Sequence, residues 1–534
     1  MVFRTIATSA ALLVGLAVVG AVAGPQWDPR PVTEHVVPAT PDTRIGGVDP
    51  AAVASGEIGA VGDHEVRTEP VTIELDGATV GGLLRRPVQA DGSLLTDRPG
   101  VVFVHGAGTG RAVEAFAGTA DDLASAGIVT LVPDKRLDTY SLRDRDYVAM
   151  ARDYDRSVEL LRGVDGVDPS RVGLYGESEG AWIVPILQAD DPSIAFTVLA
   201  SAPVVPPREQ AAYAVDNYLR HTGVPDQVFR AIPRAVGMQF PGGGFGYADF
   251  DVRPWLVRQT APVLVVYGTA DASMPLEQGA RLILADTAAG PGDAPVTVRY
   301  YEGADHGLRV RDGAAPDGAD HYPLHPDVVR DLAAWLQGQP GTADAAPQVA
   351  GATPEQLYLA APVPQPRWWG NGDVVVAAVL GGAGLVVLAL VSWGTVAVLR
   401  RVRRLARPRP HGAAHDFAPG VGGALVVLGV GSVATTGALA VYLLLVARLA
   451  FDYQRNDLIV QGGWVTVRVL GVVTAVAAAV LLQRVADVRS TRRPAGAVGV
   501  ARGVPAHVVL WCVVAGSTSL LLTLAYWGVY QLGI

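Results

Sequence analysis

Apolar and polar positions divide the chain into an alternating middle part and a largely apolar C-terminal part. Between about residues 70 and 337, short apolar runs alternate with amphipathic stretches. The run Val101–Val104 is apolar throughout, which is typical of a strand that is buried on both faces. Between about residues 146 and 162 the apolar residues recur at helical spacing, which predicts one helix with one buried face.

The same part of the chain predicts several more strands. Val71–Leu75 alternates apolar and polar residues and then turns at Asp76-Gly77 into residues 79–84, which indicates a hairpin. Further strands are expected over residues 128–132, 172–175, 196–199, 263–267 and 296–301. Strands that alternate with helices predict an α/β fold, with a mostly parallel sheet and helices on both faces. Functional residues should then follow the carboxyl ends of the strands.

Residues 203–260 interrupt this alternation. They are rich in aromatic residues and contain the run Pro241-Gly242-Gly243-Gly244. We expect them to form a small cap insertion over the strand ends, because apolar pockets that bind ligands commonly lie there. The alternative is an ordinary helical excursion that packs its aromatic rings into the core.

Four long apolar stretches follow, at about residues 374–399, 421–447, 463–482 and 506–530. Each is long enough to cross a hydrocarbon layer of roughly 30 Å as a helix. Tryptophans lie near their ends, where interfacial rings are common. The sequence therefore predicts a four-helix transmembrane region over residues 370–534, joined to the middle part by a Gly-, Pro- and Ala-rich linker over residues 338–369.

The N-terminal residues 1–24 carry Arg4 followed by an apolar run, which indicates a secretory signal peptide or an uncleaved anchor. Residues 25–69 form a Pro- and Gly-rich lead-in. Arginines gather between the first two predicted spans and between the last two. Because basic loops stay in the cytoplasm, we expect a multi-pass protein of the cytoplasmic membrane, with residues 70–337 on the extracytoplasmic side.

The composition of the chain argues against several classes of partner and site. The net charge of −9 gives no support for a nucleic-acid partner. The single cysteine, Cys512, excludes an internal disulfide and a cysteine-based metal site. The cores of the four spans contain no acidic residue, which argues against an ion pathway. Lys135 is the only lysine, so nearly all positive charge comes from arginine.

One motif points to nucleophilic catalysis. Ser178 lies in Gly176-Glu177-Ser178-Glu179-Gly180, directly after the predicted strand 172–175. In such a Gly-x-Ser-x-Gly turn, the glycines let the chain reverse sharply and expose the serine hydroxyl. A serine hydroxyl needs an adjacent histidine base, which in turn needs an acid to orient it. Asp271 and His306 each follow a predicted strand, and they come after Ser178 in that order.

These motifs together resemble the α/β-hydrolase superfamily, near its dienelactone-hydrolase and prolyl-oligopeptidase-like members. The matching segments are His105-Gly106-Ala107-Gly108, Asp134-Lys135-Arg136, Gly176 to Trp182, Gly268 to Asp271 with Met274-Pro275, and Gly303 to Gly307. The resemblance implies an α/β-hydrolase fold over residues 70–337 with Ser178 as nucleophile, His306 as base and Asp271 as acid. Ester, thioester, lactone and peptide bonds all suit these three residues, and the expected extracytoplasmic placement favours a small-molecule or lipid acyl substrate. No cofactor or metal is expected.

A tetrahedral intermediate also needs backbone donors for its oxyanion. The expected donors are the N–H of Glu179 and the N–H of Gly106 or Ala107. The side chains of Glu177 and Glu179 would raise the pKa of a nearby histidine if they pointed toward it. The loop after Arg136 departs from relatives, which often continue with glycine, so substrate preference is expected to differ.

Several alternatives stay open at this point. Ser178 could be an ordinary turn serine, and Asp305 or another carboxylate could replace Asp271 as the acid. His321 and His325 compete with His306, and with Asp320 and Asp327 they give a weak hint of a metal. The glycine-rich run after His105 fails as a dinucleotide fingerprint, because its third glycine position is Arg111. The main functional hypothesis is a membrane-tethered extracytoplasmic serine hydrolase that cleaves a carboxylic ester or a related acyl bond. The alternative is an inactive sensing or binding module on a membrane scaffold or transporter.

Overall fold

The chain folds into two units in the computed structural model, which describes residues 2–221, 224–310, 322–406, 416–451, 454–490 and 499–531. The sheet unit comprises Pro29–Asn217 and Gly244–Pro362. The helical unit comprises Met1–Asp28, Tyr218–Gly243 and Val363–Ile534. The polypeptide therefore passes between the units four times, after residues 28, 217, 243 and 362.

The sheet unit contains one sheet of nine strands in the order β1-β2-β4-β3-β5-β6-β7-β8-β9. The strands are β1 Glu65–Leu75, β2 Ala78–Val88, β3 Arg98–Val104, β4 Val129–Pro133, β5 Val167–Glu177, β6 Thr197–Ala200, β7 Val263–Gly268, β8 Val296–Tyr301 and β9 Val349–Gly351. The first two form the expected hairpin, and β2 is also antiparallel to β4. The other pairs are parallel, so the mostly parallel sheet is confirmed.

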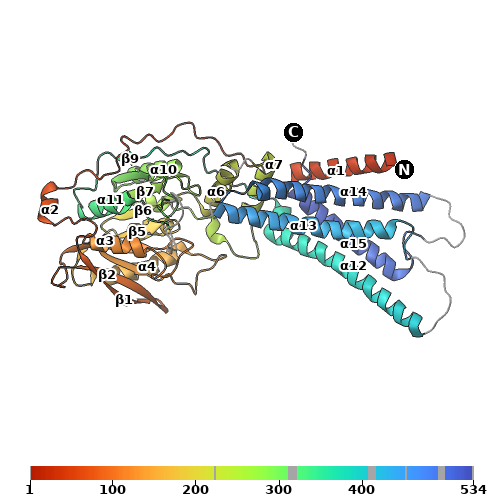
Figure 1. Cartoon of the computed structure of the whole chain (residues 1–534), viewed down its shortest axis with the longest axis horizontal. Coiled ribbons are helices and arrows are strands. Elements are labelled where there is room, and N and C mark those ends of the chain that lie inside the picture. Colours follow the sequence, from red (N-terminus) through yellow and green to blue (C-terminus); the bar gives the residue numbers. More distant parts are fainter. Residues whose placement is uncertain are drawn as a thin grey trace. The chain divides into compact units, whose positions relative to one another are not determined.

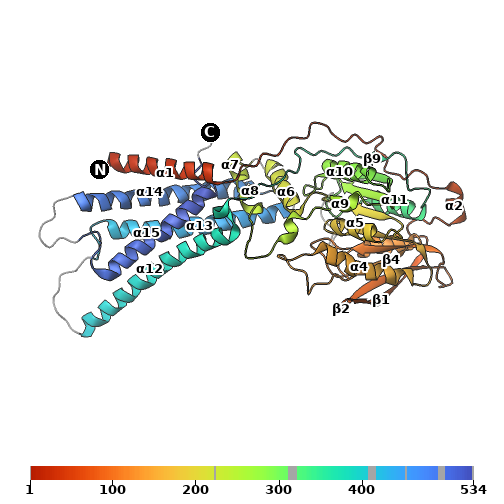
Figure 2. The ribbon, with the colours of Figure 1, turned by 180° about the vertical axis from the view of Figure 1, so that it is seen from behind.

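Helices cover both faces of this sheet (Figures 1 and 2). Val102 and Val104 of β3 pack in one core cluster with helices α4 Tyr147–Arg162, α5 Gly180–Asp190 and α10 Leu276–Ala289. Val101 and Phe103 pack in a second cluster with α3 Ala117–Ser125 and α11 Pro326–Gln337. Successive residues of one strand point to opposite faces, which explains why β3 is apolar throughout.

The insertion at residues 203–260 is divided between the two units. Its elements are α6 Pro207–His221, α7 Asp226–Phe229, α8 Ala231–Val236, η1 Gly246–Asp249 and α9 Arg253–Leu256. Residues 244–260 belong to the sheet unit, where the ring of Phe250 packs edge-on against Tyr147 with centroids 5.0 Å apart. Tyr247, Phe250 and Trp255 are partly buried and pack against the core of the sheet unit, whereas residues 218–243 belong to the helical unit.

The predicted linker also contributes to the sheet. Within residues 338–369, Val349–Gly351 form β9, which pairs in parallel with β8. The lead-in carries the short helix α2 Pro50–Ser55, and Trp368–Gly370 form the single turn η2. Only the part after Pro362 is assigned to the helical unit.

The helical unit contains five described helices that are long and apolar enough to cross a membrane. They lie in α1 Val2–Ala23, α12 Gly372–Ala406, α13 Val421–Phe451, α14 Gly463–Ser490 with the preceding turn η3 Leu458–Gly462, and α15 Gly503–Tyr526. Helix α1 packs against α14 and α15. Gly20 comes so close to the carbonyl oxygen of Ala525 that a side chain at position 20 would collide with it. The N-terminal apolar run is therefore part of the bundle.

Segment 218–243 is bonded to this bundle at several points. The Tyr218 hydroxyl donates to the carbonyl of Gln454 at 2.7 Å. The buried guanidinium of Arg234 donates to the carbonyl of Gly20 at 3.0 Å. These bonds satisfy polar groups of the segment inside the helical unit.

Candidate active site

Ser178 lies in a sharp turn between β5 and α5. Its φ of 55° is in the left-handed region, which a serine adopts only under strain. A side chain at Gly180 would collide with the carbonyl oxygen of Val104, and one at Gly176 would lie 2.7 Å from the carbonyl oxygen of Gly180. Both glycines are thus needed for the close approach of β3, β5 and α5, and the turn has the geometry expected for a nucleophile elbow.

Asp271 and His306 meet at the carboxyl ends of the adjacent strands β7 and β8. The Nδ1 atom of His306 lies 2.8 Å from Oδ2 of Asp271. The other carboxylate oxygen of Asp271 accepts bonds from the backbone N–H of Ser273 at 2.9 Å and from its hydroxyl at 2.7 Å. The acid is buried and held from both sides, so it can orient the imidazole and fix its tautomer.

Charge around His306 changes the protonation of both groups. Burial disfavours the imidazolium and by itself lowers the pKa of His306. The Asp271 carboxylate, with smaller contributions from the charges of Glu177 and Asp305, outweighs burial and raises this pKa to about 9. Burial by itself raises the pKa of Asp271, but the positive charge of His306 outweighs it, so the pKa of this carboxyl falls below its usual range. Mutual stabilisation of this kind is typical of a catalytic acid and base.

The end of strand β6 connects the serine turn with the histidine loop. The backbone N–H of Ser178 donates to the carbonyl of Ala200 at 2.9 Å. The hydroxyl of Ser201 donates to the carbonyl of His306 at 2.7 Å. Two consecutive residues thus hold both loops at the same edge of the sheet. Within the described residues the Ser178 hydroxyl has no hydrogen-bond partner, so its contact with His306 stays a prediction; such contacts often tighten only when substrate binds.

The loop after β3 lies directly beside the serine. A Cβ placed on Gly106 would lie 3.4 Å from Cβ of Ser178 and 4.0 Å from its Oγ. His105 is fully buried and bonds through Nε2 to the carbonyl of Pro133 at 2.7 Å. Burial lowers the pKa of His105 to about 4, so this histidine is a neutral structural residue. The loop that carries Gly106 and Ala107 is therefore firmly placed next to the nucleophile.

The two glutamates that flank Ser178 have different surroundings. Burial raises the pKa of Glu177, whose charge acts on His306. The fully buried Glu179 is bonded to Lys135 at 3.0 Å and to Arg145 at 2.6 Å. It also accepts from the hydroxyls of Tyr140 at 3.0 Å and Tyr147 at 3.4 Å. The direction of neither carboxylate could be predicted from the sequence. The Asp134-Lys135-Arg136 motif was the signal for the loop that, with the start of α4, supplies these partners.

The competing candidates have other contacts. Oδ1 of Asp305 accepts the backbone N–H groups of Gly307 and Arg309, both at 3.0 Å, and shapes the histidine loop. His325 caps the first turn of α11, where its Nδ1 accepts from the N–H of Asp327 at 3.3 Å. His321 and Asp320 lie outside the described residues. Among the described ones, no group of three His, Cys, Asp or Glu side chains could hold a metal ion.

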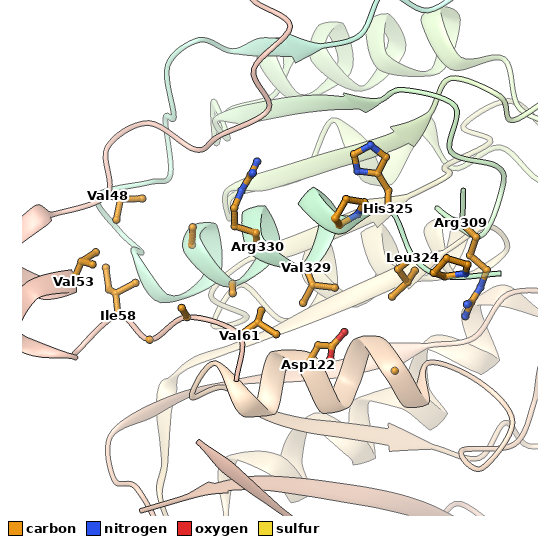
Figure 3. Close-up of a pocket in the computed structure, with 17 residues that line it drawn as sticks. Val48, Val53, Ile58, Val61, Asp122, Arg309, Leu324, His325, Val329 and Arg330 are labelled. Carbon is orange, nitrogen blue, oxygen red and sulfur yellow. The ribbon is translucent and has the colours of Figure 1, made fainter. Parts of the chain in front are cut away.

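A separate cavity of about 730 Å³ lies between the lead-in and α11 (Figure 3). Val53, Ile58 and Val61 of the lead-in line one side, and Leu324 and Val329 line another. Ser178, Asp271 and His306 are not among its lining residues. The cavity therefore belongs to another part of the sheet unit.

No protein-family model matches the chain, and no curated protein sequence matches it. Among solved structures, it is similar to a hyperthermophilic esterase from the archaeon Pyrobaculum calidifontis, with 18% identity over 55% of this chain and 88% of that chain and a TM-score of 0.36. A second similar structure is Est1E from Butyrivibrio proteoclasticus, with 17% identity over 50% and 96% of the two chains and a TM-score of 0.33.

The sheet unit has the α/β-hydrolase fold. Its strand order, antiparallel second strand and serine turn after β5 are those of that fold. The chain spans about a third, 34%, of another match, a candidate dipeptidyl aminopeptidase IV from Bacteroides ovatus, with 16% identity over 46% of this chain and a TM-score of 0.33. At such low identities the likeness concerns the fold, and the activities named belong to those proteins.

Proposed function

We propose that this protein is a membrane-anchored serine hydrolase that cleaves a carboxylic ester or a related acyl bond. The observation that carries the proposal is the 2.8 Å bond between His306 and the buried carboxylate of Asp271, at the same sheet edge as the strained turn of Ser178. An imidazole that is held by an acid is the base that activates a serine hydroxyl, and the partly buried Ser178 follows the end of strand β5 at the same sheet edge.

The proposed reaction has two halves. The Oγ of Ser178 attacks the carbonyl carbon, and its proton passes to Nε2 of His306. The tetrahedral oxyanion accepts hydrogen bonds from backbone N–H groups of Glu179 and of the Gly106–Ala107 loop. His306 then gives the proton to the leaving alcohol, thiol or amine as its bond to the carbonyl carbon breaks. Water repeats the sequence on the acyl-enzyme and restores Ser178.

The helical unit supports anchoring in a membrane. Arg4 lies 3.6 Å from Asp487 near the end of α14, so the start of α1 and the arginine-rich end of α14 are at the same end of the bundle. The Trp369 indole donates to the carbonyl of Ala23 at 3.0 Å, which places the end of α1 beside the start of α12. Because basic ends stay in the cytoplasm, this arrangement favours an extracytoplasmic position for the residues between α1 and α12.

Labelling with a fluorophosphonate probe tests the catalytic proposal. Membranes that contain the full chain should incorporate the probe, and Ser178→Ala should abolish incorporation. Ser170→Ala is a matched control, because it removes an exposed hydroxyl that bonds to Asp168 near the start of β5, away from the serine turn at the end of that strand. Equal labelling of the full chain and Ser178→Ala would overturn the proposal and favour an inactive binding module. Hydrolysis of an ester, thioester and peptide panel then identifies the acyl bond.

A further inference from the structure

Lys135, the only lysine of the chain, is buried between the two segments that flank Ser178. It is the second residue after strand β4, and its side chain is 1% exposed. The ammonium donates to the carbonyl of Gly106 at 2.6 Å and to the carboxylate of Glu179 at 3.0 Å. One cation thus joins the loop after β3 to the residue after the nucleophile.

The bond to Gly106 fixes the direction of a neighbouring donor. A trans peptide unit is planar, and its C=O and N–H point in opposite directions. The carbonyl of Gly106 and the N–H of Ala107 belong to the same unit. Since the carbonyl points toward Lys135, the N–H of Ala107 points away from it. A cation on the carbonyl also polarises the peptide and strengthens its N–H as a donor. Lys135 therefore holds the orientation of the Ala107 N–H, one of the two candidate donors in this loop.

The bond to Glu179 holds the side chain of the residue whose backbone N–H is the second expected donor. The Glu179 carboxylate is fixed by Lys135 and Arg145, and the hydroxyl of Tyr140 adds a third contact. The same hydroxyl lies 3.4 Å from the carbonyl of Ala107, and the Lys135 ammonium lies over the Tyr140 ring at 4.4 Å. Lys135 and Tyr140 thus both bridge from the loop after β3 to Glu179; both bonds to Glu179 measure 3.0 Å, and the lysine makes the shorter bond to the loop.

We propose that Lys135 is a positioning residue that aligns the two backbone donors of the oxyanion hole, the N–H groups of Ala107 and Glu179. The inference rests on the proposed function, since it concerns the same reaction. It assigns to Lys135 an effect on the transition state and none on substrate binding.

The choice of lysine agrees with this role. The chain has 42 lysines and arginines, of which all but Lys135 are arginine. A guanidinium is a wide planar fork, whereas an ammonium is a compact charge with three donors that fits a buried site between two acceptors. Burial lowers the pKa of Lys135, and the adjacent Glu179 carboxylate opposes that shift.

Steady-state kinetics of the full chain test the inference. Lys135→Met should lower kcat by about 100-fold, the loss typical of one oxyanion donor, with KM changed less than about threefold. The affinity for a trifluoromethyl ketone, which forms a hemiketal oxyanion on the serine, should fall by a similar factor. Arg145→Gln is the matched control: it removes a cationic partner of Glu179 but leaves the bond to Gly106, so kcat should fall less than about tenfold.

Two outcomes would overturn the inference. One is a folded Lys135→Met protein with kcat within about threefold of the parent; the other is an equal loss in Arg145→Gln, which would reduce Lys135 to a general partner of Glu179. Fluorophosphonate labelling of the parent that depends on Ser178 would show that the proposed function still holds in either case.

A second measurement does not depend on any variant folding. Lysine labelled with ¹⁵N at Nζ would place one ammonium signal in the whole protein, because Lys135 is the only lysine. Binding of the trifluoromethyl ketone should shift this signal, since the oxyanion draws on the peptide that the ammonium holds. An unchanged signal in the fully inhibited protein would contradict the inference.

Discussion

The imidazole of His306 is bonded at 2.8 Å to the buried carboxylate of Asp271, and this bond sets the pH dependence of the proposed reaction. His306 must be neutral to accept the serine proton, and its pKa is raised to about 9. We therefore expect kcat/KM to rise with pH and to level off only above about 9, which a pH–rate profile would measure.

Asp271→Asn should lower kcat by roughly 10³- to 10⁴-fold, because His306 then loses the correct tautomer.

Glu177→Gln should shift this profile without disabling the enzyme. The Glu177 carboxylate is one cause of the raised pKa of His306, after Asp271. The amide keeps the shape of the side chain but removes its charge, so the rise in kcat/KM should move to lower pH with little change in the plateau. Glu159→Gln, an exposed substitution on α4, serves as the control. A profile that does not move would contradict the assigned influence of Glu177.

The bonded pair of His306 and Asp271 also predicts how the stability of the protein depends on pH. The folded pKa of His306 lies above its ordinary 6.5, so its stabilising contribution is complete below 6.5 and is lost as the pH rises through about 9. The folded pKa of Asp271 lies below 3.8, so its contribution is present above 3.8 and is lost in acid. Thermal midpoints from pH 6 to 10 should therefore converge for the parent and His306→Gln at the alkaline end. A constant difference would count against the coupling.

Ser178→Gly should be inactive yet more stable than Ser178→Ala. The left-handed φ of 55° costs any residue with a Cβ, whereas glycine adopts it freely. We expect a difference of about 1 kcal/mol in the free energy of unfolding, measured as a higher thermal midpoint for the glycine variant. Equal midpoints would mean that the turn carries no such strain.

A chain reduced to residues 25–366 should fold poorly. It lacks the parts of the helical unit that accept the bonds of segment 218–243, among them the carbonyl of Gly20 for Arg234 and that of Gln454 for Tyr218. Exposed apolar and unpaired polar groups there favour aggregation and local opening. Limited proteolysis should cut the truncated chain within 218–243 and spare this segment in the full protein. Replacement of the segment by a flexible Gly/Ser linker should improve recovery of the truncated chain.

Gly20→Leu tests whether α1 belongs to the bundle. A large side chain would collide with the backbone at Ala525, where α1 and α15 approach closely. We expect a lower thermal midpoint in detergent, while Gly15→Leu should be tolerated because the space around Gly15 is open. Similar midpoints for both variants would contradict the observed packing.

The fold was largely predictable because its signals are local. Apolar strands alternate with helices, and Ser178, Asp271 and His306 each follow a strand, so the topology brings their loops to one edge. The direction of Glu179 was not predictable, because its partners come from a loop more than 30 residues away in sequence. The division of residues 203–260 between the sheet unit and the helical unit was not predictable either. A segment that packs on a sheet and one that packs on membrane helices can have the same aromatic composition.

The four passages of the chain between its units determine how proteolysis could separate the sheet unit from the helical unit. A protease that cuts once, for example after Pro362, leaves the other three tethers intact. Cuts after residues 28 and 362 would still leave Tyr218–Gly243 in the helical unit, joined at both of its ends to the sheet unit. Release of the hydrolase free of membrane parts needs scission at all four junctions, after which the two fragments would be held together by pairing of β6 with β7.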